Sequence, residues 1–327
     1  MAIFISNTII IVAMDFCKKW DIIGLGAIAV DDLLYVASFP QPNSKIEVLQ
    51  RVRQGGGLTG TALVAASRLG ASTAYMGMLG NNDLSDFTRK EFSKEHVDFS
   101  LCPQTENARP IYSSIIVDQS SGDRTILYSL ENFAPPPPES VPDDLPGRCK
   151  LLFLDTYFLS LFPYLINSSR ACKTPVIADV ESRNILNHPG VIDEIDYLIL
   201  SKDLAAEITR SESPKDILEG LTSPNRRCTV VTEGKNGCWF KEKGSSVFHM
   251  PSFPVNAVDT TGCGDVFHGA YAAAIVRGES NTTCVIQASA AAAIKATRPG
   301  GRAGIPNLQS LQKFISVNSN IIPHKVP

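Results

Sequence analysis

Short apolar runs alternate with helix-length segments from Trp20 to the end of the chain. The runs are rich in Ile, Val and Leu, which predicts repeated β-α units around a mostly parallel sheet and therefore an α/β fold. Strands are expected at Asp21–Ile28, Ser72–Gly77, Leu151–Asp155, Pro175–Asp179, Tyr197–Leu200 and Cys228–Thr232. Helices are expected at Thr59–Leu69, Asp83–His96, Ser160–Ala171, Lys202–Thr209, Val266–Val276 and Thr283–Ala296.

A second pattern interrupts this rhythm. Apolar and polar residues alternate at Ser44–Arg53, as in a sheet with one wet face, and Ile111–Asp118 and Arg124–Leu130 form a pair of similar runs joined by a hairpin-type connection. We therefore expect a small antiparallel sheet built from about residues 32–54 and 109–134, acting as a lid or as an interface. Four prolines, Pro135–Pro138, predict a stiff extended return to the core.

Composition supports a folded protein with small-molecule partners. The chain has 327 residues, 44% of them hydrophobic, and a formal charge of −3 from 30 Lys+Arg against 33 Asp+Glu. This balance excludes disorder and disfavours nucleic acid or an anionic membrane as partner. We expect one large domain over residues 20–315, followed by a tail over residues 316–327.

The cysteines and the N-terminus bear on location. The 8 Cys lie far apart without a C-x-x-C pair, which favours free thiols and a cytoplasmic protein. The apolar stretch Ala2–Ala13 has no preceding Lys or Arg and about half of the ~20 residues that a membrane span needs. We interpret residues 1–19 as an extension, with Met14 as an alternative start.

The segment Val258–Gly269 carries the strongest chemical signal. Gly262 and Gly264 flank Cys263 at the expected start of a helix, where free N–H groups and the helix dipole favour an anion. Asp265 follows in the first turn and could accept a proton from an attacking hydroxyl. The alternative is an ordinary glycine turn in which the aspartate only caps the helix.

This run, Asp259-Thr260-Thr261-Gly262-Cys263-Gly264-Asp265, resembles the D-[TS]-x-G-x-G-D signature of the ribokinase-like (PfkB) family of sugar and nucleoside kinases. Further resemblance covers about Ile23 to Pro306, in Gly24–Gly26 with Asp31, Gln54–Gly57, Val231–Gly237 and Ala296–Gly301. The resemblance implies a three-layer α/β/α sandwich with a β-lid, and a kinase that uses ATP with Mg²⁺.

The resemblance also implies roles for individual residues. Asp265 would be the general base, and Gly262, Cys263 and Gly264 the anion hole. The residues that would bind the substrate are Asp31, Gly56, Gly57, Thr61 and Arg109, and Arg124 is an alternative to Arg109. Asp155 is a further substrate-binding candidate, because its strand ends where α/β sheets bind ligands. ATP would contact Ser201, Thr232, Gly234 and Gly237. A candidate potassium site would use Asp259 and Thr261 with backbone oxygens near Ala296, Pro299 and Gly301, although Gly304 stands where a hydroxyl ligand is expected.

Two departures from the family pattern are visible. The usual Asn-x-x-Glu that organises Mg²⁺ is replaced by Ser201-Lys202-Asp203, which resembles ketohexokinase, as does Ser121–Tyr128 in the lid. Glu207 could substitute for the missing acid, and Asp179 and Glu181 could line the nucleotide or Mg²⁺ region. Thr61 stands where sugar kinases place an Asn, which predicts a substrate other than ribose or fructose.

Two functions therefore remain open. The first is an ATP-dependent kinase of a small polyhydroxylated substrate. The alternative is a catalytically weak family member that binds a nucleotide, a metabolite or a protein partner. An apolar lid face also predicts a homodimer.

Overall fold

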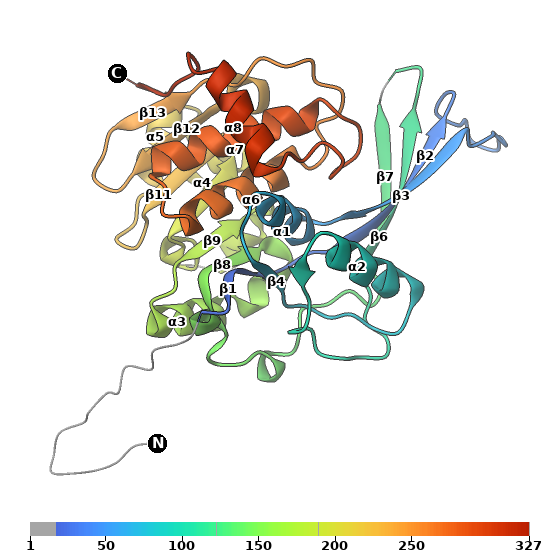
Figure 1. The fold of residues 1–327 in the computed structure, drawn as a ribbon, viewed down its shortest axis with the longest axis horizontal. Helices are drawn as coiled ribbons and strands as arrows, with labels where there is room; N and C mark the ends of the chain where they lie inside the picture. Colours follow the sequence, from blue (N-terminus) through green and yellow to red (C-terminus); the bar gives the residue numbers. More distant parts are fainter. Residues whose placement is uncertain (1–17, 122, 189, 327) are drawn as a thin grey trace, which may run out of the picture.

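A ten-stranded sheet forms the centre of the computed structural model, which describes residues 18–121, 123–188 and 190–326 (Figure 1). The strand order is β14-β13-β12-β11-β10-β9-β8-β1-β4-β5. Pairing is parallel from β11 to β5 and antiparallel from β11 to β14, so the predicted mostly parallel sheet is confirmed. The strands are β1 (Trp20–Leu25), β4 (Thr73–Tyr75), β5 (Val97–Asp98), β8 (Cys149–Asp155), β9 (Val176–Asp179), β10 (Tyr197–Ser201), β11 (Cys228–Thr232), β12 (Cys238–Glu242), β13 (Val247–Met250) and β14 (His324–Lys325).

Helices cover both faces of this sheet, which confirms the predicted three layers. One face carries α1 (Leu58–Arg68), α2 (Asp83–Lys94), α6 (Cys263–Val276), α7 (Asn281–Ala296) and α8 (Leu308–Val317), and the other carries α3 (Phe162–Cys172), α4 (Lys202–Thr209) and α5 (Pro214–Gly220). Successive residues of each central strand enter opposite cores: Ile22 packs on the α1 side and Ile23 on the α3 side.

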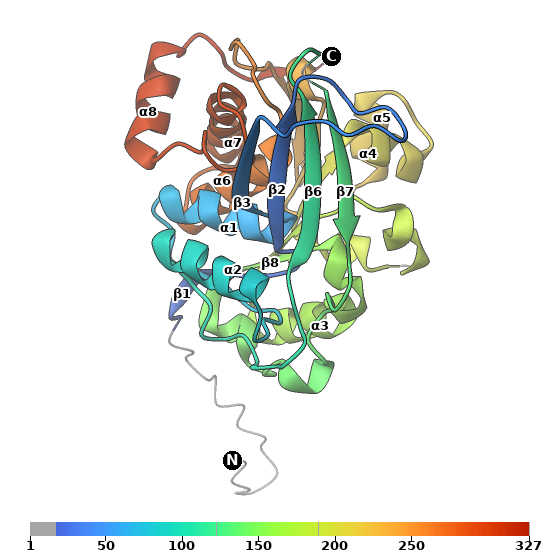
Figure 2. The same cartoon turned by 90° about the vertical axis from the view of Figure 1, so that its right-hand side faces the viewer.

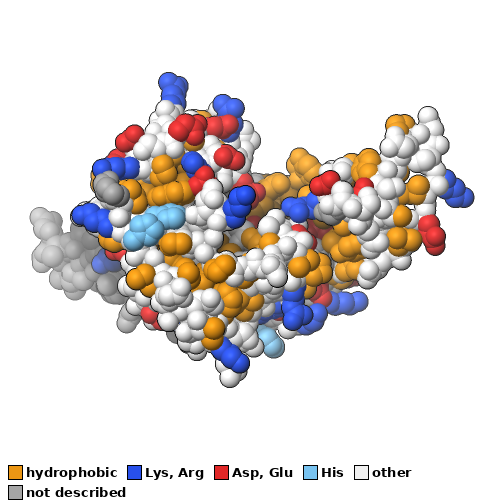
Figure 3. Space-filling model, turned by 90° about the horizontal axis from the view of Figure 1, so that it is seen from above, with side chains coloured by type: hydrophobic (Ala, Val, Ile, Leu, Met, Phe, Trp, Pro, Cys, Tyr) orange, Lys and Arg blue, Asp and Glu red, His pale blue; other side chains and the backbone are white. Residues whose placement is uncertain are grey.

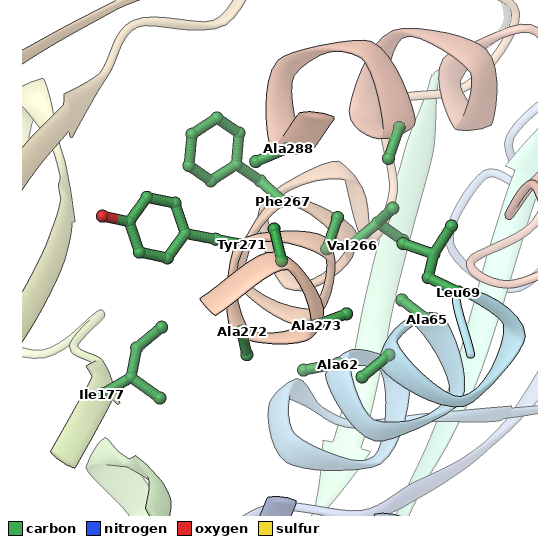
Figure 4. Close-up of a cluster of buried hydrophobic side chains, with 14 of the residues drawn as sticks. Ala62, Ala65, Leu69, Ile177, Val266, Phe267, Tyr271, Ala272, Ala273 and Ala288 are labelled. Carbon is green, nitrogen blue, oxygen red and sulfur yellow. The ribbon is translucent and has the colours of Figure 1, made fainter. Parts of the chain in front are cut away.

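Helix α6 is enclosed by other helices. It packs between α1 and α7, with Ala62 and Ala65 of α1 facing it (Figure 4). A Cβ atom at Gly269 would lie 2.2 Å from the carbonyl oxygen of Ala62, so the two helices approach almost backbone to backbone. This contact fixes where α6 begins, at the carboxyl edge of the parallel strands.

A separate four-stranded sheet, the lid, stands beside the core (Figure 2). Its order is β3 (Gln50–Gly56), β2 (Ala29–Val36), β6 (Ile111–Asp118) and β7 (Arg124–Ser129). The outer pairs are antiparallel as expected, whereas β2 and β6 pair in parallel. The parallel pair is feasible because the chain passes through α1, β4, α2 and β5 before it returns as β6, which is a long crossover connection.

One lid boundary in the sequence interpretation was wrong. The alternation from Ser44 predicted a strand over residues 44–53, but β3 begins at Gln50 and residues 44–49 are exposed. Ile46, Val48 and Leu49 are each more than 40% exposed, so the alternation there does not mark a buried face. The lid also contains β2, a strand that the sequence interpretation did not assign, although it began the lid at about residue 32.

The chain ends add three observations. The predicted N-terminal extension lies almost entirely outside the described residues, as does the alternative start at Met14. The expected tail boundary at residue 315 falls within α8, and His324–Lys325 pairs with β13. No helix of the described residues is long and apolar enough to cross a membrane, and the seven described cysteines are free thiols.

Asp32 ties the lid strands together. Its carboxylate, 2% exposed, accepts two hydrogen bonds from Arg53 at 2.7 and 2.8 Å, one from Arg51 at 2.8 Å and one from the Tyr112 hydroxyl at 3.0 Å. Arg53, and then Arg51 and Tyr112, hold the pKa of Asp32 well below its usual value. The carboxylate must therefore be ionised for β2, β3 and β6 to stay joined by this network.

We predict that Asp32→Asn loosens the lid. Amide hydrogen exchange in residues 50–56 should become about tenfold faster, the effect of losing one or two charge-assisted hydrogen bonds. Because the folded pKa is lowered, this stabilisation is present above about pH 4 and is lost as the pH falls further. Asp123→Asn, an exposed residue in the turn between β6 and β7, is the matched control. Equal exchange rates in the two variants at neutral pH would contradict the role given to Asp32.

Candidate active site

Four carboxyl groups, from β8, β9, the loop after β9 and α6, meet at the carboxyl edge of the core sheet. Asp155 ends β8, Asp179 ends β9, Glu181 follows Asp179, and Asp265 lies in the first turn of α6. Carboxylate oxygens of Asp179, Glu181 and Asp265 all lie within 4.8 Å of one another. Burial, followed by repulsion from Glu181, raises the pKa of both Asp179 and Asp265 well above the ordinary value. The site therefore favours a bound cation or a retained proton.

The predicted anion turn is formed at the start of α6. Gly262, at φ 74°, adopts the left-handed conformation that favours glycine and stands at the N-cap position. It has no side chain to occupy the N–H groups of the first turn, and a Cβ at Gly264 would meet nothing within 4 Å. The Cys263 N–H donates to the Thr260 carbonyl at 3.2 Å. The N–H groups of Gly264 and Asp265 are therefore the ones open to an oxyanion, with the Asp265 carboxyl directly beside them.

A cavity of about 390 Å³ lies beside this turn. Residues from two parts of the predicted nucleotide site line it together. Thr232, Gly234 and Gly237 line it from the β11–β12 region. Cys263, Gly264 and Ala296 line it from α6 and α7. Ala292 and Ala293 form part of its wall. The small side chains of α7 thus leave room for a ligand, and not only for helix packing.

Ser201 does not line this cavity. Its hydroxyl caps α4 by accepting a hydrogen bond from the Leu204 N–H at 3.3 Å, although the residue stands opposite Thr232 in the strand register. Glu207 is also removed from the carboxyl cluster, because it is 48% exposed and pairs with Arg183 at 3.1 Å. The acids that gather near Asp265 are Asp179 and Glu181 instead.

The predicted substrate residues converge from the lid and α1. Asp31 of β2 lies against the glycine run of β3, where a Cβ at Gly56 would lie 2.3 Å from the Asp31 carboxylate. Burial raises the pKa of Asp31. Asp31 and Gly57 are partly exposed, whereas Gly56 and Thr61 are buried, so the first pair is the more accessible to a ligand.

Sequence reasoning missed Arg302, which organises this region. Its guanidinium, in a side chain 6% exposed, donates to the Gly56 carbonyl at 2.8 Å and to the Thr61 hydroxyl at 3.3 Å. Burial lowers the pKa of Arg302 to about 10, against the opposing effect of Asp31. An arginine directly after Gly300-Gly301 was the available signal, but it lies one residue beyond the motif that was considered.

Asp155 is fully buried and is engaged by the chain itself. Its Oδ2 accepts hydrogen bonds from the Ala27 N–H at 2.6 Å, the Thr59 hydroxyl at 2.7 Å and the Thr59 N–H at 3.2 Å. Its Oδ1 accepts one from the Tyr157 N–H at 2.9 Å. Burial raises its pKa to about 6. Asp155 therefore ties β8 to the β1–β2 link and to α1, beneath the region where a substrate would bind.

The two candidate arginines lie at opposite ends of the β6–β7 strand pair. Arg109 pairs with Glu131 at 3.1 Å, just before β6 begins. Arg124, at the start of β7, reaches Asp259 of the core at 3.6 Å. Arg124 thus links the lid to the loop that leads into the anion turn.

The residues of the candidate potassium site are brought together. The Asp259 carboxylate accepts from the Thr261 N–H and the Gly300 N–H, each at 2.8 Å. The Ala296 carbonyl accepts from the N–H groups of Val258 and Asp259. The loop that holds Pro299 and Gly301 therefore lies directly against the loop that precedes Gly262.

An acid lies beside a helix N-terminus, next to a cavity lined by a second glycine turn, and this arrangement is suited to phosphoryl transfer. A match to the pfkB family carbohydrate kinase model spans residues 21–308, and the chain belongs to this family. It is thus a kinase of the sugar and nucleoside type, as the motifs predicted. The closer resemblance to ketohexokinase stays a prediction.

Similar proteins agree with this assignment. A ribokinase of Staphylococcus aureus is 24% identical over 303 residues, which cover 88% of this chain and 97% of the relative. Ribokinase from Thermotoga maritima superposes with a TM-score of 0.78 at 23% identity, covering 91% of this chain and 99% of that one. Ribokinase of Arabidopsis thaliana, solved in complex with ribose and ATP, gives 0.78 at 19% identity, with 91% and 99% covered. These structural matches confirm the predicted fold.

Proposed function

We propose that this kinase transfers the γ-phosphoryl group of ATP to a hydroxyl of a small sugar or nucleoside, with Asp265 as general base. The observation that carries the proposal is the position of the Asp265 carboxyl beside the open N–H of Gly264, which lines the 390 Å³ cavity. The cavity would hold ATP, and the region between Asp31 and Asp265 would hold the acceptor.

The reaction follows from this arrangement. The acceptor hydroxyl gives its proton to the Asp265 carboxylate as its oxygen bonds to the γ-phosphorus. The bond from that phosphorus to the bridging oxygen breaks, and ADP leaves. N–H groups of the glycine turn stabilise the charge that spreads over the transferring group.

Magnesium ion fits the carboxyl cluster beside Asp265. Oδ2 of Asp179 is buried without a hydrogen-bond partner, and carboxylate oxygens are the ligands that this ion prefers. We infer that Asp179 and Glu181 hold the ion that arrives with ATP. When bound, it supplies positive charge next to the phosphates. That charge also favours the ionised form of Asp265, whose pKa is otherwise raised.

The acceptor would lie against Asp31 and Gly57. A partly exposed carboxylate can accept hydrogen bonds from two hydroxyl groups of a polyol. Thr61, which replaces the expected amide, is buried and bonded to Arg302, so it shapes the site from behind. This difference supports a substrate other than ribose or fructose. The predicted cytoplasmic location stays a prediction.

Asp265→Asn tests the catalytic proposal. In an ADP-release assay over sugars, sugar phosphates and nucleosides, the variant should lose about 10²- to 10⁴-fold in kcat on any substrate that the parent protein phosphorylates. Its affinity for ADP should change little, because the nucleotide cavity is intact. Asp216→Asn, an exposed acid at the start of α5, should behave like the parent.

The alternative function gives a different pattern in the same assay. A catalytically weak member would bind ATP but release no ADP with any acceptor, and Asp265→Asn would then change nothing. The gathering of Asp179, Glu181 and Asp265 favours the active enzyme. Loss of the usual Asn-x-x-Glu favours the alternative.

We further propose that two copies associate through their lids. Hydrophobic side chains gather over the lid (Figure 3), and on β7 Ile126, Leu127 and Tyr128 are 48%, 58% and 63% exposed. Such an edge strand is suited to pairing with a second copy.

Light scattering should therefore give about twice the 35.4 kDa chain mass. Leu127→Asp should shift the protein toward the single-chain mass, because it places a charge in the expected contact. A parent protein that elutes at the single-chain mass would contradict dimerisation.

A further inference from the structure

Lys295 is a fully buried lysine on the last turn of α7. Its side chain is 0% exposed, although lysine is almost never fully buried unless it is paired. The ammonium donates a hydrogen bond to the backbone carbonyl of Asp259 at 2.8 Å. Burial lowers the pKa of Lys295, while Cys263, Asp259 and Asp265 oppose that shift. The Nζ of Lys295 thus lies inside the loop pair that precedes the anion turn.

The oxygen atoms expected to bind potassium are already engaged near this ammonium. The Asp259 carbonyl accepts from Lys295, and both oxygens of its carboxylate accept from backbone N–H groups of Thr261 and Gly300. The Ala296 carbonyl accepts from Val258 and Asp259. Arg124 adds a second cationic group 3.6 Å from the Asp259 carboxylate. These contacts leave the Asp259 and Ala296 oxygens poorly suited to ligate a metal ion.

The position expected to supply a hydroxyl ligand is closed for a steric reason. A Cβ at Gly304 would lie 2.4 Å from the Lys295 carbonyl oxygen and 2.9 Å from the Lys295 Cα. The backbone of Lys295 therefore excludes any side chain there. The residue that brings a charge into the site also prevents residue 304 from supplying a ligand.

We propose that the Lys295 ammonium takes the place of a monovalent cation in this protein, so that the kinase works without potassium. In this proposal the Lys295 ammonium, and not a metal ion, holds together the two loops of the candidate potassium site. Those loops contain Asp259, Thr261, Ala296, Pro299 and Gly301. Lys295 is a positioning residue: it holds the Asp259 backbone, three residues before Gly262, and through it the anion turn. This inference rests on the proposed kinase function only for its activity readout.

Thermal unfolding tests the inference without any kinase assay. The melting temperature of the parent protein should be the same in KCl, NH₄Cl and choline chloride at equal ionic strength. Lys295→Ala should melt lower in choline chloride, and K⁺ or NH₄⁺ should restore part of the loss by entering the space of the missing ammonium. Lys313→Ala, an exposed lysine of α8, should behave like the parent in all three salts.

Activity supplies the second readout once a substrate is found. The parent kcat should agree within about twofold between KCl and choline chloride, whereas Lys295→Ala should be at least about tenfold slower in choline chloride and gain from K⁺.

Specific stabilisation or activation of the parent by K⁺ would overturn the proposal. So would a loss in Lys295→Ala that neither cation reverses, since Lys295 would then serve packing alone. If Lys295→Ala does not fold, the salt comparison on the parent protein still shows whether K⁺ stabilises it specifically. Absence of kinase activity would affect the proposed function and leave the melting result valid.

Discussion

A cluster of carboxyl groups, of which Asp155 and Asp179 are buried, is the constraint around which this active site is built. Asp155, Asp179, Glu181 and Asp265 meet at one edge of the core sheet, and Asp31 approaches from the lid. Burial raises the pKa of Asp31, Asp155, Asp179, Glu181 and Asp265, and repulsion from Glu181 adds to the rise for Asp179 and Asp265. Any ligand that binds here must therefore bring positive charge or hydrogen-bond donors, as Mg²⁺ with ATP and a polyol would.

Two buried cationic side chains lie behind the same edge of the sheet and oppose its negative charge. Arg302 faces the substrate side through Gly56 and Thr61, and Lys295 faces the nucleotide side through Asp259. Both belong to the short stretch that ends α7 and follows it. This stretch therefore sets the position of the substrate glycines and of the anion turn together, which couples the acceptor and donor halves of the site.

Local motifs allowed much of the site to be predicted from sequence. The glycine turn with Asp265 and the turn of Thr232, Gly234 and Gly237 are each contiguous, and the structure brings them to one cavity. The parallel core was predictable because buried strands read as apolar runs. Contacts between distant segments could not be predicted, because they depend on which segments meet in space. Examples are the parallel β2–β6 pair, the contacts of Arg302 and the hydrogen bonds of Asp155. The exposed alternation before Gln50 misled, because period two alone does not show that one face is buried.

Proton release on binding Mg²⁺–ADP tests the central claim most directly. Titration calorimetry at pH 7 in two buffers of different ionisation enthalpy measures the number of protons exchanged. If the carboxyl cluster of Asp179, Glu181 and Asp265 retains a proton until positive charge arrives, binding must release protons, and Asp179→Asn must reduce the number. A binding heat that is independent of the buffer would contradict this account.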